Sequence, residues 1–403
     1  MKNSWSASRR GFLRGIMSPA MMPAAAAAQS GPAKAEPAPK IYLNEYTPKT
    51  MLVLPEHRPA RAKFPIIDVH THVSRFFGMQ AFGAGPVNTP EPADMEKPRA
   101  EIRRIVSAMD QLNLKLLLNL TGGTGAVLER NIRELPGRHK GRFLVCTEPS
   151  YQKYADEGYP TWQADELARA KRAGAVGLKV IKSLGLVLRE RITEGPLVKI
   201  DDPRFDPMWS ACGELNLPVF IHIADPDAFF TPIDRFNERY DELQRRPEWG
   251  FYGADFPKKA DLLAQRNRVI ERHPKTTFVC LHVANHPENL GEVTGWLRRY
   301  PNMQCEVAAR ISELGRQPRQ SQKFFDEFQD RIMFGTDVSG GLGLGLYGPY
   351  FRFFETLDEY FDYASAPIPP QGRWKIYGIG LPDAILKKVY HNNAARLLGL
   401  AAI

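Results

Sequence analysis

The sequence predicts a (β/α)8 TIM barrel with loop insertions, in a single catalytic α/β domain. Eight short apolar segments are spread along the chain, and most of them are followed by a segment with helical periodicity. About 340 residues remain after a Pro- and Ala-rich N-terminal stretch, a length that suits such a barrel. A doubly wound open sheet is the alternative, but no G-x-G-x-x-G sequence follows the first apolar segment.

The N-terminal residues have the pattern of a targeting segment. Ser8-Arg-Arg-Gly-Phe-Leu13 is a twin-arginine signature, and the Ala24–Ala28 cluster supplies small residues for a signal peptidase. The weakly apolar run between them is too short to span a bilayer. We therefore expect residues 1–28 to be a signal peptide for export to the periplasm, residues 29–63 to be a linker and lead-in segment, and residues 64–400 to form the barrel.

Charge and cysteine usage exclude several classes of protein. The net charge of +9 falls to +5 without the first 28 residues, which carry four basic residues and no acidic one. No basic run is longer than three residues, so we expect no nucleic-acid partner, and no membrane association of the mature form. The four cysteines show no C-x-x-C spacing and predict neither a zinc knuckle nor a disulfide framework.

The first predicted strand, Pro65-Ile-Ile-Asp-Val-His-Thr-His-Val73, ends in the pair His70 and His72. Residues two apart on a strand point to the same face, so one rigid element presents two imidazoles to one transition-metal ion. Taken alone, the pair fits two hydrogen-bonded or surface histidines equally well. The rest of the chain favours a metal site.

Seven further strands follow the first one. We expect them at 114–120, 142–146, 176–181, 218–223, 276–282, 302–307 and 331–334. Amphipathic helices are expected at 100–112, 162–173, 206–215, 258–272, 287–300 and 320–329, and two closing helices at 381–391 and 392–399.

Polar residues of the metal-binding types stand at the carboxyl ends of three later strands. His222 closes the fifth strand, His282 the sixth and Asp337 the eighth. In a parallel barrel these ends converge on one mouth, where active sites form. Any one of these residues alone fits a core histidine or a helix-capping aspartate, but all of them together with the first-strand pair predict an active site.

In this order the residues resemble the amidohydrolase superfamily, in particular its metal-dependent hydrolase branch, which also contains decarboxylases and lactonases. The resemblance spans about residues 64–400, and segments such as Lys182-Ser-Leu-Gly185 resemble an exported twin-arginine subgroup. It implies that His282 lies beside a metal ion, polarising the substrate or steering the bound water. The ion, zinc in the first place with another divalent metal as the alternative, would be held by His70, His72, His222 and Asp337.

Three neutral imidazoles and a carboxylate leave a metal ion Lewis acidic, with an open position for a water whose pKa falls toward about 7. Asp337 is expected to take the proton from that water, a role that Asn cannot fill. We therefore expect a hydrolase that opens a C–O or C–N bond, as in a lactone, ester or amide of a small organic acid. The alternatives are a nonhydrolytic decarboxylase of the same fold and a noncatalytic metal-bearing scaffold.

Two basic residues bear on the metal count and on the substrate. In some branches of the superfamily a lysine on the fourth strand, here Lys179, is carboxylated and bridges two ions. We expect one ion in preference to two, with Lys179 as a cationic substrate-binding residue. Arg310, after the seventh strand, is predicted either to clamp a substrate carboxylate or to form a structural ion pair.

Long insertions follow the first strand, at 74–97, and the fifth strand, at 225–257. Loops of this length on the active-site side of a barrel suit lids. The second insertion is rich in aromatic residues, which also suit a subunit contact, so both a monomer and a homodimer stay open. The glycine-rich segment Gly340–Gly345 predicts a flexible rim. It does not predict a phosphate-binding loop, because no Lys-Ser/Thr follows it at the needed spacing.

Overall fold

The computed structural model describes residues 39–42, 45–77 and 90–402. The chain divides into two compact units, 1–53 and 54–403, and all described helices and strands belong to the second. The predicted signal peptide and much of the insertion after the first strand lie outside the described residues. In the described part, no helix is long and apolar enough to cross a membrane.

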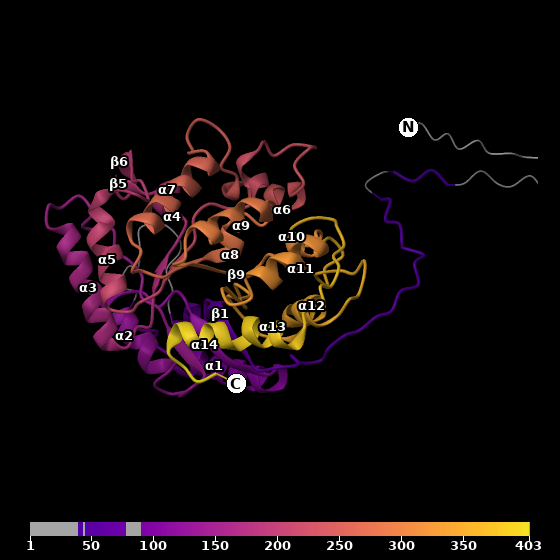
Figure 1. Ribbon diagram of the computed structural model, residues 1–403, viewed down its shortest axis with the longest axis horizontal. Helices are drawn as coiled ribbons and strands as arrows, with labels where there is room; N and C mark the ends of the chain where they lie inside the picture. The colour runs from indigo at the N-terminus through magenta and orange to yellow at the C-terminus, as the bar shows by residue number, and fades with distance from the viewer. Residues whose placement is uncertain (1–38, 43–44, 78–89, 403) are drawn as a thin grey trace, which may run out of the picture. The chain divides into compact units, whose positions relative to one another are not determined.

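Eight parallel strands form the centre of the second unit (Figure 1). One run pairs β1 (Ile66–Thr71), β2 (Leu114–Asn119) and β3 (Phe143–Val145) in that order. The other run pairs β4 (Leu178–Val180), β7 (Val219–Ile221), β8 (Phe278–Cys280), β9 (Met303–Glu306) and β10 (Ile332–Met333). A parallel bridge from Thr147 to Leu178 joins β3 to β4, and one from Thr71 to Val338 joins β1 to the chain after β10. The two bridges close the sheet, so the predicted (β/α)8 barrel is confirmed.

Helices surround the strands in Figure 1, and the six predicted between strands are confirmed within a few residues. They are α1 (Glu96–Leu112), α3 (Tyr159–Ala173), α5 (Asp206–Glu214), α7 (Lys259–Arg272), α9 (Leu290–Arg299) and α11 (Pro318–Glu327). The closing helical segment comprises α13 (Asp383–Lys387), the π-helical η5 (Lys388–Asn392) and α14 (Asn393–Leu398). Unpredicted elements include α2 (Gly125–Glu134), α12 (Leu344–Glu355) and the antiparallel pair β5 (Arg189–Arg191) and β6 (Glu194–Leu197). Short helices that were not predicted are α4 (Ser183–Leu186), α6 (Tyr240–Arg245), α8 (Leu281–Ala284) and α10 (Ile311–Leu314).

Helix α12 begins at Leu344 and so includes the last two residues of the predicted rim at Gly340–Gly345, whereas residues 340–343 lie outside any helix or strand. Its buried aromatic residues include Tyr347 and Tyr350, whose rings lie 6.3 and 5.5 Å from that of Phe334. This burial outweighs the poor helix propensity of glycine.

The apolar residues of the strands form two clusters, because successive side chains along a strand point to opposite faces of the sheet. The smaller cluster includes Ile67, Val69, Leu116, Leu118, Phe220, Val279 and Met333, together with Ala394 and Ala395 of α14. The intervening residues, such as Leu117 and Val219, pack with the apolar faces of the helices in the larger cluster. Because both faces of the strands are buried, the strands are apolar almost throughout, as in other parallel sheets.

The last ten residues of the predicted lead-in, 54–63, belong to the barrel unit. The His57 N–H donates to Asp358 Oδ2 at 2.7 Å, and the Ala62 N–H donates to the carbonyl of Leu112 at 3.1 Å. These bonds attach the segment to α1 and to the chain after α12.

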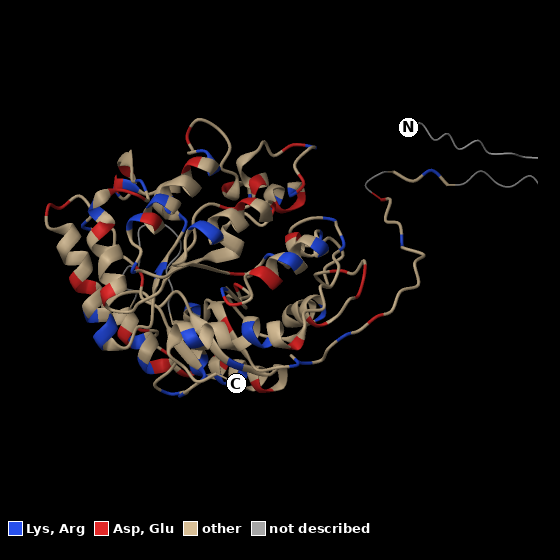
Figure 2. Cartoon of the chain, viewed as in Figure 1, with Lys and Arg blue, Asp and Glu red and all other residues tan. Residues whose placement is uncertain are grey.

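Basic and acidic residues are interspersed along the helices, as the colouring of Figure 2 shows. Arg298 of α9, for example, pairs with Glu327 of α11 at 2.6 Å, and Arg299 pairs with Glu271 of α7 at 2.8 Å. All four cysteines are buried and free.

Candidate active site

The ends of β1 and β10 bring His70, His72 and Asp337 together. Asp337 Oδ1 lies 2.9 Å from His72 Nε2 and 3.3 Å from His70 Nε2. The Asp337 N–H donates to the His70 carbonyl at 2.8 Å, so closure of the barrel itself sets this geometry. Asp337 has φ +65, a left-handed conformation that is strained in a non-glycine residue and is often found at functional sites.

The rings of His222 and His282 extend this group. Ring centroids are 4.5 Å apart for His222 and His282, 4.8 Å for His282 and His70, and 5.1 Å for His70 and His72. The four imidazoles therefore follow one another around the carboxyl ends of β1, β7 and β8. The structure thus brings together all five residues predicted to form the centre.

Two imidazole nitrogens of this group are buried without a hydrogen-bond partner in the described part of the chain: Nε2 of His222 and Nε2 of His282. The His282 Nδ1–H donates to the Ala308 carbonyl at 2.8 Å, so its Nε2 carries the lone pair. Asp225 Oδ1 lies 3.5 Å from His222 Nε2, the outer limit of a hydrogen bond. A buried lone pair without a partner is costly in a core, but a metal ligand needs a free lone pair.

The protonation states also suit metal binding. Burial lowers the pKa of His70, of His222 and of His282, and the Lys179 ammonium adds to the effect on His70. Burial opposes ionisation of Asp337, but His70 and His72 hold the pKa of that carboxyl well below its usual range. Neutral imidazoles and an ionised carboxylate are the forms that bind metal.

These residues fit a divalent metal ion. Ligand atoms of His70, His72 and Asp337 all lie within 4.8 Å of one another. Imidazole nitrogens combined with one carboxylate oxygen are a donor set that zinc prefers. Which residues act as ligands remains a prediction.

Lys179 of β4 lies inside the same group. Its Nζ is 3.4 Å from His70 Nε2, and burial lowers the pKa of the amine to about 8. The position is compatible with either predicted role, a cationic pocket residue or a carboxylated bridge between two ions.

Arg310 is buried beside this group. Burial is the main cause that lowers the pKa of His282, and the positive charge of Arg310 contributes to the same shift. Its Nη1 donates to the Ala309 carbonyl at 2.8 Å, whereas its Nε has no partner in the described part of the chain. None of the ion pairs formed by described residues includes Arg310, so the structural ion pair considered as one alternative is not observed there. An arginine in this state offers donors to an anionic ligand.

Glu306, at the end of β9, is a site residue that the sequence analysis missed. Its fully buried carboxylate accepts hydrogen bonds from His70 Nδ1–H at 3.1 Å and from the backbone N–H of His282 at 2.6 Å. Burial raises its pKa to about 7. Carboxylates in this position orient metal-binding histidines and fix their tautomers. The available signal was an acidic residue at the carboxyl end of an apolar strand.

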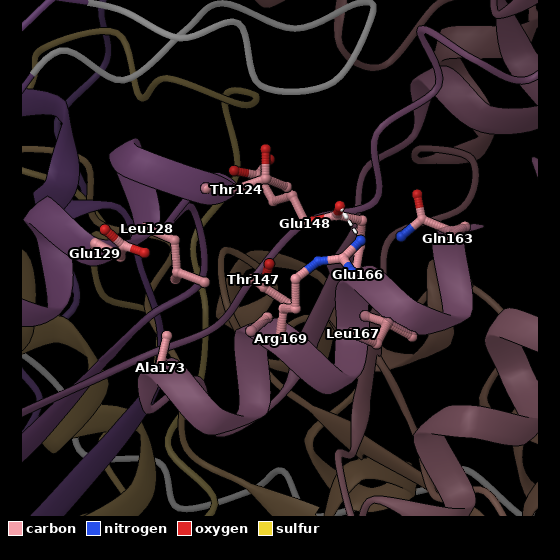
Figure 3. Close-up of a pocket in the computed structure, with 12 residues that line it drawn as sticks. Thr124, Leu128, Glu129, Thr147, Glu148, Gln163, Glu166, Leu167, Arg169 and Ala173 are labelled. Atoms are coloured by element: carbon pink, nitrogen blue, oxygen red, sulfur yellow. Dashed lines mark hydrogen bonds and ion pairs between the residues drawn. The ribbon is translucent and has the colours of Figure 1, made fainter. Parts of the chain in front are cut away.

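A cavity of about 100 Å³ lies between α2 and α3 (Figure 3). The carbonyl of its lining residue Thr147 accepts a hydrogen bond from the backbone N–H of Lys179 at 2.8 Å. Its polar lining is satisfied internally: Glu166 pairs with Arg169, Gln163 accepts from the Ser150 N–H at 2.9 Å, and Glu148 accepts from the Gly123 N–H at 3.0 Å. Burial raises the pKa of Glu148 to about 7. The cavity contains none of the predicted site residues, and we do not assign the chemistry to it.

Residues 155–400, more than half of the chain, match a family model described as amidohydrolase. A search of curated proteins found no significant match.

Similar solved structures include three enzymes from bacteria. 2,6-Dihydroxybenzoate decarboxylase from Rhizobium is 14% identical, with a TM-score of 0.48 over 83% of this chain and 99% of that one. A probable 2-pyrone-4,6-dicarboxylic acid hydrolase from Acinetobacter baumannii is 14% identical, with a TM-score of 0.44 over 84% and 100%. 4-Oxalomesaconate hydratase from Rhodopseudomonas palustris is 13% identical, with a TM-score of 0.47 over 83% and 95%.

Proposed function

The chain belongs to the amidohydrolase family, and from this premise we propose that it is an exported metal-dependent hydrolase acting on a small organic acid. The bond opened is a C–O or C–N bond, as in a lactone, ester or amide. The observation that carries the proposal is the convergence of four imidazoles and Asp337, in which Nε2 of His282 is buried without a partner in the described part of the chain.

The proposed ligands of one zinc ion are His70, His72, His222 and Asp337. Such an ion would supply Lewis acidity and would lower the pKa of a coordinated water. The ionised Asp337 carboxylate accepts the proton of the attacking water, because its neighbours keep it deprotonated. His282 would lie beside such an ion, where its Nε2 lone pair would accept a hydrogen bond and orient the water or the substrate.

The state of His282 favours hydrolysis over decarboxylation. Its Nδ1–H donates to the Ala308 carbonyl, so in the neutral ring Nε2 is an acceptor. A decarboxylase that used His282 to protonate a substrate carbon would need the opposite state.

The substrate class follows from the cations beside the centre. Arg310 is the proposed clamp for a substrate carboxylate, since it is buried and no described residue forms an ion pair with it. Lys179 adds a second positive charge in the pocket. The proposed substrate is therefore a small anionic molecule. We propose no nucleic-acid or membrane partner, because the chain is only moderately charged.

Export to the periplasm is proposed from the twin-arginine signature at Ser8–Leu13 and the alanine cluster that follows it. The aromatic insertion at 225–257 is proposed to act as a lid or as a homodimer contact. The ring centroids of Trp249 and Phe251, both in this insertion, lie 5.8 and 5.4 Å from Lys182 Nζ.

Metal content tests the proposal first. The mature protein is purified without chelator and analysed by mass spectrometry, alongside His72→Ala and Lys179→Ala. We expect one equivalent of zinc, lost in His72→Ala and retained in Lys179→Ala. Two equivalents of metal in the unsubstituted protein, with fewer in Lys179→Ala, would instead indicate a two-metal site bridged by Lys179. If the protein binds no divalent metal under any loading condition, it is not the proposed enzyme.

Product analysis then separates hydrolase from decarboxylase. Lactones, esters, amides and carboxylated aromatic acids are screened in ¹⁸O-labelled water. We expect the label in the product and no carbon dioxide. Carbon dioxide release without incorporation of the label would identify the nonhydrolytic decarboxylase instead.

A further inference from the structure

The chain after β8 forms one turn of left-handed helix at the active site. His282, Val283, Ala284 and Asn285 have φ values of 56, 55, 56 and 56. This conformation costs an L-residue about 1–2 kcal/mol, and a β-branched residue such as Val283 enters it only when its surroundings require it. Asn285 and His282 belong to residue types that are enriched there, whereas Val283 and Ala284 do not.

Asn285 ties this turn to the neighbouring strand. Its side chain is fully buried, its Oδ1 accepts from the Ile223 N–H at 3.1 Å, and its Nδ2 donates to the Ala224 carbonyl at 3.1 Å. Ile223 and Ala224 directly follow His222, and Ala224 is itself left-handed, with φ 68. One amide therefore joins the backbone beyond His222 to the turn that begins at His282.

Further bonds hold the turn from the other side. Arg266 of α7 donates from Nη1 to the Ala284 carbonyl at 2.6 Å, and Glu306 accepts from the His282 N–H. None of these contacts joins β7 to β8 as the Asn285 amide does. The backbone ladder between β7 and β8 ends at Ile221 and Cys280, and beyond it the Asn285 amide links the chain after His222 to the turn that carries His282, whose rings lie 4.5 Å apart.

We propose that Asn285 is a positioning residue, whose side-chain amide sets the spacing and orientation of His222 and His282 by clamping the ends of β7 and β8 together. The inference rests on the proposed function, because it places both histidines at a metal centre. A residue with this role acts through the histidines and does not touch the substrate.

The test replaces Asn285 while keeping its backbone conformation. Asn285→Gly retains left-handed φ but removes the amide, and Asn285→Asp retains the acceptor for the Ile223 N–H. Asn216→Gly is the matched control, since Asn216 is exposed and left-handed, with φ 50, and precedes β7 at the opposite end of the barrel. Thermal unfolding of the metal-free proteins establishes that each variant folds.

Two measurements read the position of the histidines. Imidazole ¹⁵N–¹H spectra of metal-free protein report the tautomer and surroundings of each ring, and chelator competition reports Zn²⁺ affinity. In Asn285→Gly we expect the His222 and His282 signals to move while that of the distant His139 stays. We also expect Zn²⁺ affinity to fall about 10- to 100-fold, less in Asn285→Asp, and within about twofold of unsubstituted protein in Asn216→Gly.

Unchanged His222 and His282 signals in Asn285→Gly would overturn the inference, and so would a loss of Zn²⁺ affinity no larger than in the control. If Asn285→Gly does not fold, the same signals in Asn285→Asp decide. If the unsubstituted protein binds no Zn²⁺, the proposed function fails, but the spectra of metal-free protein still decide whether Asn285 positions the two rings.

Discussion

Glu306 shows how one side chain organises the candidate centre. Its carboxylate receives donors from His70 and from the backbone of His282, which come from β1 and from the turn after β8. Because the carboxylate is fully buried, removing it would leave these donors without an acceptor, at a cost in free energy. Glu306 therefore fixes the tautomer of His70, so that the His70 lone pair is on Nε2, which faces Asp337.

Glu306→Gln is expected to weaken Zn²⁺ binding by about 10- to 100-fold, because the amide keeps the shape but cannot accept all the donors that the carboxylate accepts. Chelator competition measures the change. Glu327→Gln, which removes an exposed carboxylate of α11, is the control. Equal affinities in the two variants would show that Glu306 does not orient His70.

Arg310→Met is expected to raise KM for a carboxylate substrate by about 10- to 100-fold, since a charge-assisted bidentate bond is worth about 1.5–3 kcal/mol. Arg310→Lys should recover part of the loss. Steady-state kinetics compare the acid with its neutral amide analogue. A rise in KM of the same size for both compounds would contradict a role for Arg310 in binding the carboxylate.

Among the secondary-structure elements, α2 illustrates why some helices escape sequence analysis. Its buried face includes Arg130, Asn131 and Glu134, so the apolar periodicity that marks a helix is interrupted. Glu134 is fully buried and bonded to Arg99 of α1, to Arg133 and to Arg138. This ion-pair network replaces part of the apolar contact between α1 and α2.

The same network predicts a pH dependence of stability. Burial by itself would raise the pKa of Glu134, but the hydrogen bonds from its three arginines outweigh burial and lower the pKa to about 2. Because the folded value lies below the ordinary 4.5, the stabilisation is complete above pH 4.5 and is lost as the pH falls toward 2.

Unfolding free energies of the wild type and of Glu134→Gln are therefore expected to differ by about 3 kcal/mol at pH 7. The difference should narrow as the pH falls below about 4.5. Denaturant titration between pH 7 and pH 3.5 measures it, with Glu129→Gln on the exposed face of the same helix as control. A difference that is constant over this range would contradict the ion-pair interpretation.

In the molecule as a whole, the candidate metal centre depends on closure of the barrel. His70 and Asp337 come from the first and last strands, and they meet because the end of β1 pairs with the chain after β10. A ligand that bridges these two ends binds the folded barrel and not the unfolded chain, so it stabilises the fold.

Zn²⁺ at 100 times its dissociation constant is therefore expected to stabilise the protein by about 2.7 kcal/mol and to raise Tm by a few degrees. Scanning fluorimetry over a Zn²⁺ series measures the shift. His72→Ala should abolish the concentration-dependent rise, and Asn216→Gly should retain it. A rise that persists in His72→Ala would place the stabilising ion elsewhere.

The sequence by itself determined the eight strands, most of the helices that connect them, and the location of the five candidate site residues at strand ends. Hydrophobic periodicity and position relative to a strand end are local properties, so one segment at a time is enough to recognise them. The family resemblance rested on the same residues, and the family match agrees with it.

Only the tertiary structure decided how those side chains are held. The roles of Glu306 and of Asn285 depend on donors from other strands, and Arg310 differs from a structural ion-pair residue only through its surroundings. The left-handed turn from His282 to Asn285 runs against the local preference of Val283 and exists because contacts from β7, α7 and β9 require it. Contacts between segments distant in the chain have no local signature, and therefore only the folded molecule shows them.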